Sequence, residues 1–265
     1  MGTLAYYIRI YFLIVSQYIK ARMQYRVDFI ISLFGMLIIN VSGFFTFWVL
    51  FHSITSFDGW SYYEIIFIYA FSLLALTPQQ LFFDNLWNLN THLILGTFTK
   101  YYFKPLNIMF YYTSEVFDIK GLGQLVFGVI ILIYASIKLE IEWSFVKILL
   151  LAINLFSSSL IMISIMILSA SLGFWVSNTA SLLDFVFRFR DFVRYPITIF
   201  NGFFRFIFTF VIPTGFIAFY PSKIFLRQGE FDILMYFSPI VGVALFIVAY
   251  KVWSRGVNCY LGTGS

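Results

Sequence analysis

The sequence predicts an all-α, polytopic transmembrane protein, and three observations support this prediction. Apolar residues make up 61% of the chain and charged residues only 11%. The mean hydropathy is +0.90, whereas soluble domains are about 45–50% apolar. Apolar runs recur along the chain, and one helical crossing takes about 20 residues. We therefore expect residues 1–265 to form a single transmembrane domain of six spans, with no soluble catalytic domain beside them.

The first element that we expect is a helix over about residues 4–24, lying in the membrane interface. Its polar stripe of Arg9, Ser16, Lys20 and Gln24 faces a broad surface of Tyr, Ile, Phe and Leu. Helices with such opposed faces lie along a bilayer with the apolar side buried. A tilted additional span is the alternative, because the apolar face is wide.

Apolar runs then predict the spans. Their approximate ranges are 28–53, 62–88, 106–135, 145–174, 178–198 and 232–254. Basic residues cluster before the first span, after the second and after the last: Lys20, Arg22, Arg26, Lys100, Lys104, Lys251 and Arg255. Because cytoplasmic loops carry the excess of Lys and Arg, both termini are expected inside. The net charge of +5 therefore reflects orientation in the bilayer and does not indicate a nucleic-acid partner.

The most polar stretch lies where the fifth span is expected. It contains five charged residues: Asp184, Arg188, Arg190, Asp191 and Arg194. On a helix they share one arc of roughly 160°, with phenylalanines opposite. Each charge facing lipid would cost about 2.5–3.5 kcal/mol, so the arc must face protein or water. Asp184 with Arg188 and Asp191 with Arg194 can pair, which leaves one arginine in surplus and suggests an anionic or polar passenger, or a partner helix.

Two topologies are possible for this region. In the first, 178–198 crosses the membrane and about 199–227 forms a re-entrant helical hairpin. In the second, 176–196 is a solvated cytoplasmic turn and 199–220 crosses. Prolines break the later stretch into short pieces, because each removes a backbone donor. These are Pro196, Pro213 and Pro221.

The loop between the second and third spans, about residues 90–105, is short and amphipathic. His92, Lys100 and Lys104 occupy polar positions, with apolar residues between them. Pro105 suits the first turn of the next span, where a missing N–H costs nothing. Such a segment can dock on a partner protein, although an interfacial loop without a partner is the commoner case.

The motifs that would indicate catalysis or nucleotide binding do not occur in the sequence. There is no G-x-x-x-x-G-K-[ST] phosphate loop, no H-E-x-x-H and no G-x-S-x-G. One cysteine, Cys259, excludes an internal disulfide and a thiolate metal cluster, and His52 and His92 lack ligands at motif spacing. We therefore expect no catalytic residue, metal or cofactor in this chain, and any energy must come from elsewhere.

Three places in the sequence resemble the ABC-2 type permease family. The first reads ILGTFTKYYFKPL and is similar to that family's cytoplasmic segment before the third span. The second, similar to its fifth span and following hairpin, reads RFRDFVRYPITIFNGFFRFIFTFVIPTGFIAFYPS. The third is the closing pattern of Trp253 to Gly256 and Tyr260 to Ser265. The charged stretch departs from the mostly apolar fifth span of many members.

The resemblance implies the transmembrane subunit of a bacterial ABC exporter in the cell membrane. It implies a second permease subunit, the same or different, and a cytoplasmic ATPase in two copies that would carry the ATP. Residues implied in coupling to that ATPase are His92, Leu93, Gly96, Phe98, Lys100, Lys104 and Pro105. It also favours the re-entrant hairpin over the cytoplasmic turn.

Two questions about function stay open at this point. An ATPase-independent channel or an ion-coupled carrier, using the charged helix as its path, is the alternative to the exporter. Drug, peptide, lipid and polysaccharide passengers all suit a cavity of aromatic residues and a few charges.

Overall fold

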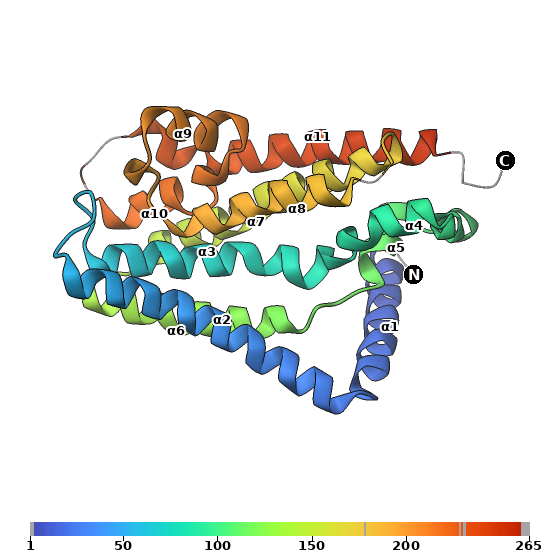
Figure 1. The fold of residues 1–265 in the computed structure, drawn as a ribbon, viewed down its shortest axis with the longest axis horizontal. Coiled ribbons are helices and arrows are strands. Elements are labelled where there is room, and N and C mark those ends of the chain that lie inside the picture. The colour runs from blue at the N-terminus through green and yellow to red at the C-terminus, as the bar shows by residue number, and fades with distance from the viewer. Residues whose placement is uncertain (1–2, 178, 228, 230–231, 261–265) are drawn as a thin grey trace.

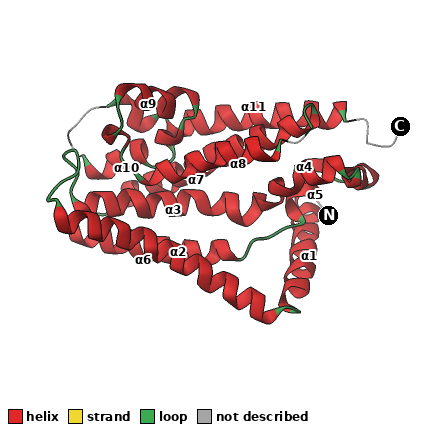
Figure 2. Ribbon diagram, in the orientation of Figure 1, coloured by secondary structure: helices red, strands yellow, loops and turns green. Residues whose placement is uncertain are grey.

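A computed structural model describes residues 3–177, 179–227, 229 and 232–260. In this part of the chain it contains eleven α-helices and no β-strand, which confirms the all-α polytopic fold class (Figure 2). Five helical stretches are long and apolar enough to cross a membrane: Arg26–Ser53, Tyr62–Ile94, Lys120–Lys138, Phe145–Phe174 and Ser238–Cys259. A bent pair, Gly202–Val211 with Thr214–Leu226, raises the number to six if it counts as one span.

Five long helices form the bundle and run roughly side by side along its length (Figure 1). They are α2 (Arg26–Ser53), α3 (Tyr62–Phe83), α6 (Lys120–Lys138), α7 (Phe145–Ser171) and α11 (Ser238–Cys259). The helix α3 contacts α2, α6 and α7, and α11 packs along α7. Because α3 lies between three neighbours, its side chains are the most buried, and Ile65 through Ile68 are fully enclosed.

Local sequence features fix where several helices begin. At the start of α3, the Glu64 carboxylate accepts hydrogen bonds from the Ser61 N–H and hydroxyl, each at 2.8 Å. Ser144 accepts the Lys147 N–H at the start of α7. The helix α11 carries a proline in its first turn, where the absent donor is not needed. These caps satisfy backbone donors that helix termini otherwise leave unpaired.

Glycines allow close approach between helices of the bundle. A Cβ on Gly242 of α11 would lie 2.5 Å from the Ser157 carbonyl oxygen of α7. A Cβ on Gly121 or Gly128 of α6 would lie 2.8 or 3.0 Å from the side chain of Leu81 or Leu74 of α3, respectively. The sequence GLGQLVFG thus serves packing, as small residues do where helix backbones approach.

The helix α1 (Thr3–Met23) lies across one end of the bundle instead of along it (Figure 1). It is not among the helices apolar enough to span. That this helix lies in the membrane interface stays a prediction from its sequence. The start of α1, the short helix α4 (Leu89–Ile94) and the end of α11 all lie at this end (Figure 1), hereafter the α4 end.

The structure divides two of the expected spans. Residues 106–135 become α5 (Ile108–Ser114), an unwound stretch at 115–119 and then α6, because polar side chains at the break find partners elsewhere in the fold. Residues 62–88 become α3 followed by a 3₁₀ segment over Asp84–Asn88, which leads into α4.

The stretch expected as a span over 178–198 is also shorter than a continuous helix. It consists of α8 (Ala180–Arg188) and a 3₁₀ segment over Phe189–Arg194. Helical geometry ends at Tyr195, whose φ of −109° and ψ of 148° are extended, because the following Pro196 disfavours helical backbone before it. The two pieces still lie within the bundle, α8 against α7 and the 3₁₀ segment against α3.

The region 199–227 folds as short pieces at the opposite end from α4 (Figure 1). The helix α9 (Gly202–Phe206) continues as a π-helical turn, and α10 (Phe219–Leu226) returns after a bend of 72°. The Thr209 and Tyr220 hydroxyls, 3.0 Å apart, join the two arms. The last long helix begins at Ser238, later than the 232 expected from hydropathy, after a 3₁₀ turn over Ile233–Tyr236.

The close contact between α7 and α11 gives a first prediction. Gly242→Ala should destabilise the bundle by about 1–3 kcal/mol, because its methyl group would overlap the Ser157 backbone. Gly35→Ala is the matched control, since nothing lies within 4 Å of its Cβ position and alanine favours helix. The thermal unfolding midpoint in detergent measures both. Equal midpoints for the two variants would contradict the packing described here.

Candidate functional site

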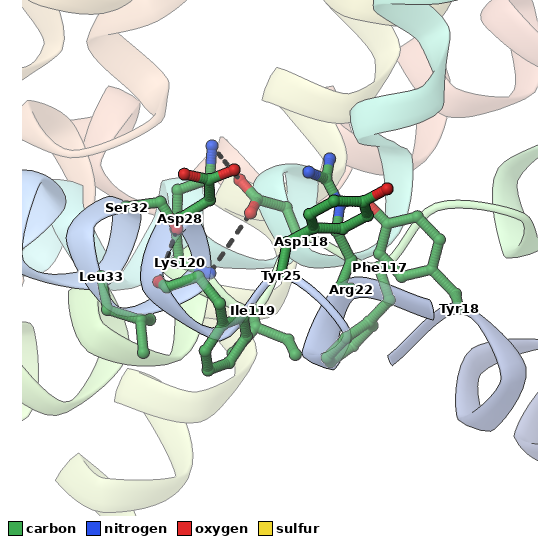
Figure 3. A pocket seen from close by; sticks show the side chains of 11 residues that line it. Tyr18, Arg22, Tyr25, Asp28, Ser32, Leu33, Phe117, Asp118, Ile119 and Lys120 are labelled. Atoms are coloured by element: carbon green, nitrogen blue, oxygen red, sulfur yellow. Dashed lines mark hydrogen bonds and ion pairs between the residues drawn. The ribbon is translucent and has the colours of Figure 1, made fainter. Parts of the chain in front are cut away.

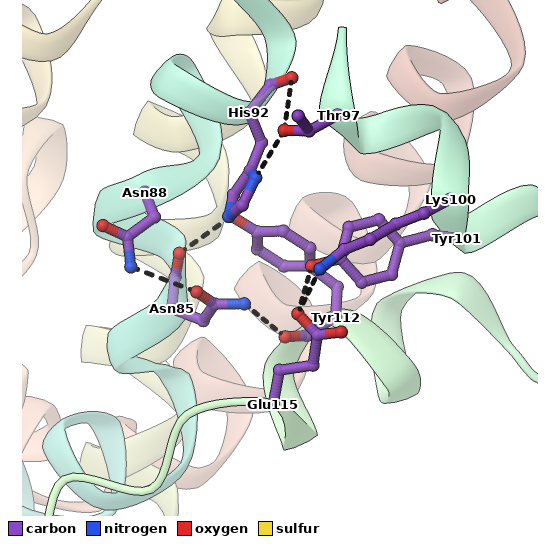
Figure 4. Close-up of polar contacts among 8 residues, drawn as sticks. All are labelled: Asn85, Asn88, His92, Thr97, Lys100, Tyr101, Tyr112 and Glu115. Carbon is purple, nitrogen blue, oxygen red and sulfur yellow. Dashed lines mark hydrogen bonds and ion pairs between the residues drawn. The ribbon is translucent and has the colours of Figure 1, made fainter. Parts of the chain in front are cut away.

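The first candidate region is a compact cap at the α4 end. The helix α4 ends at Ile94, and a 3₁₀ segment over Thr97–Phe103 follows. Gly96 between them has φ of +71°, a left-handed conformation that glycine adopts without strain. His92 Nδ1 lies 2.8 Å from the Thr97 hydroxyl and closes the turn (Figure 4). The chain therefore doubles back sharply and forms one rigid unit.

The ring of Phe98 is fully buried and lies at the centre of an aromatic cluster. Six rings surround it with centroids at 5.2–6.2 Å: Tyr101, Tyr102, Tyr112, Phe174, Trp253 and Tyr260. These residues come from the 3₁₀ segment, from α5, from the turn after α7 and from the end of α11. Phe98 thus connects the cap to three other parts of the bundle through edge and tilted ring contacts.

Hydrogen bonds attach the cap to the same neighbours. The Tyr260 hydroxyl donates to the Leu93 carbonyl oxygen at 3.2 Å, and the Tyr102 hydroxyl donates to the Val257 carbonyl oxygen. Asn85 and Tyr112 bond each other twice, at 2.7 and 2.8 Å (Figure 4). The cap is therefore fixed to the end of α11, and the 3₁₀ segment that leads into α4 is fixed to α5.

Glu115 lies in the unwound stretch after α5 and binds two groups of the cap. Its Oε2 lies 3.0 Å from Lys100 Nζ and accepts a hydrogen bond from the Tyr101 hydroxyl (Figure 4). Two effects raise the pKa of Tyr101 far above its usual value. The larger is burial, and the second is the hydrogen bond to Glu115. The phenol stays protonated at physiological pH and remains a donor, so the cap is tied to the chain that enters α6.

Several residues at the end of α4 and at the end of the following 3₁₀ segment are exposed, and most of them are apolar. We call them together the end surface: Ile94, Leu95, Phe103, Lys104 and Pro105. Leu95 is 67% exposed and Phe103 82%. Exposed apolar patches of this kind mark sites of interaction. Of the seven residues expected in coupling, two are buried, two are half-buried and three are exposed. In that order they are Leu93 and Phe98, His92 and Gly96, and Lys100, Lys104 and Pro105.

The second candidate region is the charged stretch from α8 into the 3₁₀ segment. Arg188 lies 3.0 Å from Asp184, and Arg194 lies 2.6 Å from Asp191. Both pairs have the spacing seen in the sequence. Three of the four side chains are more than half exposed, and Arg194 is 31% exposed. This stretch packs on α3 and α7. Asp184 and Arg188 are exposed, whereas Asp191 and Arg194 line a cavity beside α3. The exposed charges need protein or water to cover them.

Arg190 is the surplus arginine, and it lies over the Phe187 ring at 4.7 Å. Within the described residues its guanidinium makes no hydrogen bond or ion pair. It lines a cavity of about 140 Å³ whose other polar residues are Asn40, Tyr69, Ser72, Gln124, Asp191 and Arg194. The buried Asn40 Nδ2 also has no hydrogen-bond partner. The cavity, here named the Arg190 cavity, therefore contains two donor groups without a partner, the Arg190 guanidinium and Asn40 Nδ2.

The three prolines of the hairpin are all buried. Pro196 ends the charged stretch, Pro213 lies at the 72° bend, and Pro221 is in α10. Their positions explain why 199–227 folds as short pieces packed on α3 and α7.

Sequence reasoning gave no role in the cap to the residues that hold it in place: Asn85, Tyr101, Tyr112, Glu115 and Trp253. A signal existed for Glu115, because a charge within an apolar run is unusual. The others are aromatic or amide residues in a chain that is 23% aromatic, so composition does not distinguish them. Among the described residues no group of three or more His, Cys, Asp or Glu could hold a metal ion.

Comparison with known proteins assigns the chain to a family. Residues 37–264 match the sequence profile of a family described as ABC-2 family transporter protein. No curated protein and no solved structure gives a match. The matched range includes four of the five long helices and most of α2, as well as the cap, the charged stretch and the hairpin. The chain therefore belongs to the ABC-2 transporter family and is a multi-pass membrane component of a transporter.

Proposed function

We propose that the chain is the permease subunit of an ABC-2 type exporter in a bacterial cell membrane, driven by a separate cytoplasmic ATPase. The observation that carries the proposal is the end surface, an exposed apolar patch on a cap that is itself firmly held. It lies at the end where α1 crosses the bundle and α11 ends (Figure 1), and these elements carry basic residues. Basic residues mark the cytoplasmic side, so both termini and the end surface face the cytoplasm.

The contacts of the cap give a route from the ATPase into the bundle. The helix α4 follows α3 through the 3₁₀ segment over Asp84–Asn88. Phe98 contacts Trp253 of α11, and Tyr101 holds Glu115 ahead of α6. Motion of the end surface would shift these helices together, as expected for rigid-body coupling. ATP would bind only to the partner ATPase, in two copies, and this chain would need no cofactor.

The charged stretch supports a passenger path shared with a second permease subunit. Its ion pairs are exposed on a single chain, and lipid is a poor environment for them. A second subunit, the same or different, would enclose them in a polar passage. The unpaired Arg190 beside Asn40 favours a passenger with an anionic or other acceptor group.

Affinity purification of the tagged chain from its native membranes tests the proposal. We expect an ABC ATPase with a phosphate-loop sequence to co-purify, and the complex to hydrolyse ATP while the isolated chain does not. The purified chain should neither transport nor conduct alone when reconstituted in liposomes. Transport or conductance by the chain without any ATPase would contradict the exporter and favour a channel or carrier.

Gly96 offers a test of the coupling route. Its φ of +71° is forbidden to proline, which fixes φ near −65°, but is tolerated by asparagine. In the complex with its ATPase, Gly96→Pro should reduce passenger-stimulated ATP hydrolysis at least about tenfold, because the cap can no longer fold back. Gly96→Asn should retain most of the stimulation. Full stimulation in the proline variant would exclude the cap as the coupling element.

A further inference from the structure

A second cavity, of about 140 Å³, lies at the elbow where α1 meets α2 (Figure 3). We call it the elbow cavity. Both helices and the start of α6 line it. Charged side chains of both signs, Arg22, Asp28, Asp118 and Lys120, gather on one side, with Leu33 and Ile119 on the other (Figure 3). A cavity with balanced charge and an apolar wall fits a ligand that is zwitterionic and amphipathic.

Two of the four charges are already occupied within the protein. Asp118 Oδ2 accepts from Gln80 Nε2 at 3.1 Å and lies 3.5 Å from Lys120 Nζ. Its Oδ1 accepts the Lys120 N–H at 3.3 Å. Asp118 therefore has little capacity left, whereas the Lys120 ammonium has three donors, of which this ion pair uses one.

Arg22 and Asp28 are the charges without an ionic partner. Arg22 uses Nε to donate to the Tyr18 hydroxyl at 3.0 Å, and its two terminal amino groups make no bond to any described residue. The carboxylate of Asp28 likewise has no hydrogen bond or ion pair with the described residues. The elbow cavity thus offers free donors at Arg22 and a free acceptor at Asp28, on two different helices.

If α1 lies in the membrane interface, as its sequence predicts, the elbow cavity lies at headgroup depth. The helix α1 crosses the end of the bundle as an interfacial helix does (Figure 1). The apolar helix α2 begins at Arg26, directly after the elbow, and enters the bundle. A phospholipid headgroup lies at this boundary, and its acyl chains would run along the exposed apolar face of α2, which includes Ile30 and Phe34. The cavity has a volume of only about 140 Å³, so a headgroup would enter it and the acyl chains would lie outside.

We propose that the elbow cavity binds the headgroup of an ethanolamine phospholipid. The phosphate lies between Arg22 and Lys120, and the ammonium donates to Asp28. Charge-assisted hydrogen bonds of this kind are stronger than neutral ones. A choline headgroup has no N–H to donate to Asp28, and a glycerol headgroup brings no cation. The bound lipid would bridge α1 and α2 and fix the angle between them, and this role does not depend on the proposed exporter function.

Native mass spectrometry of the purified full chain in a neutral detergent tests the proposal. The probe is an equimolar mixture of dioleoyl phosphatidylethanolamine, phosphatidylcholine and phosphatidylglycerol. We expect one ethanolamine lipid to be retained at least about tenfold over the other two. Equal retention of all three, or preference for phosphatidylglycerol, would overturn the proposal.

Single substitutions test the phosphate contact and the ammonium contact of the headgroup separately. Arg22→Gln should lower retention of all three lipids about tenfold, because the phosphate loses its main partner. Asp28→Asn should abolish the preference for ethanolamine over choline and leave choline retention unchanged. Arg9→Gln, on the exposed face of α1 and outside the cavity, is the matched control and should match the unmodified chain. An Asp28→Asn variant that keeps the ethanolamine preference would also refute the site, and circular dichroism establishes that each variant is folded.

Discussion

The burial of Phe98 is the interaction on which the arrangement of the α4 end depends. Its ring joins the cap to α5, to the turn after α7 and to α11. A single buried aromatic side chain contributes about 3–5 kcal/mol when compared with alanine, so the cap moves with these elements and not as a loose loop. The end surface is carried by this cap, so in the proposed function its motion would reach the bundle through the same contacts.

A different constraint governs the charged stretch. Inside the bundle, polar groups need partners, because lipid supplies none. Asp184 and Asp191 form ion pairs with arginines four and three residues later in the chain. Arg190 instead lines a cavity together with Asn40, whose Nδ2 has no hydrogen-bond partner. Stability alone does not account for this excess of donors, which an acceptor group on a passenger would satisfy. In the proposed mechanism the contact with the ATPase thus depends on aromatic packing at the cap. Binding of the passenger depends on the unsatisfied donors in the Arg190 cavity.

Hydropathy predicted the helical class because membrane helices need long apolar runs, and the fold has them. It did not predict the break at 115–119, because Glu115 is satisfied by Lys100 and Tyr101, residues 15 and 14 positions away. Similarly, the amphipathic loop indicated a docking segment, but periodicity does not tell which apolar residues turn inward. Phe98 is buried and Leu95 exposed because of partners on α11 that only the fold reveals. That Asn40 and Arg190 line the same cavity likewise depends on tertiary packing, which the sequence alone does not show.

Cysteine cross-linking to the ATPase tests most directly whether the end surface is where the ATPase engages. With Cys259 replaced by serine, Leu95→Cys places a reactive thiol on the end surface, and Phe145→Cys places one at the start of α7, where the side chain is 81% exposed. In membranes where the chain is co-expressed with its ATPase, a short bifunctional thiol reagent should join the Leu95→Cys variant to the ATPase and leave the Phe145→Cys variant unlinked. Cross-links from position 145, or none from position 95 in a complex that hydrolyses ATP, would contradict the account.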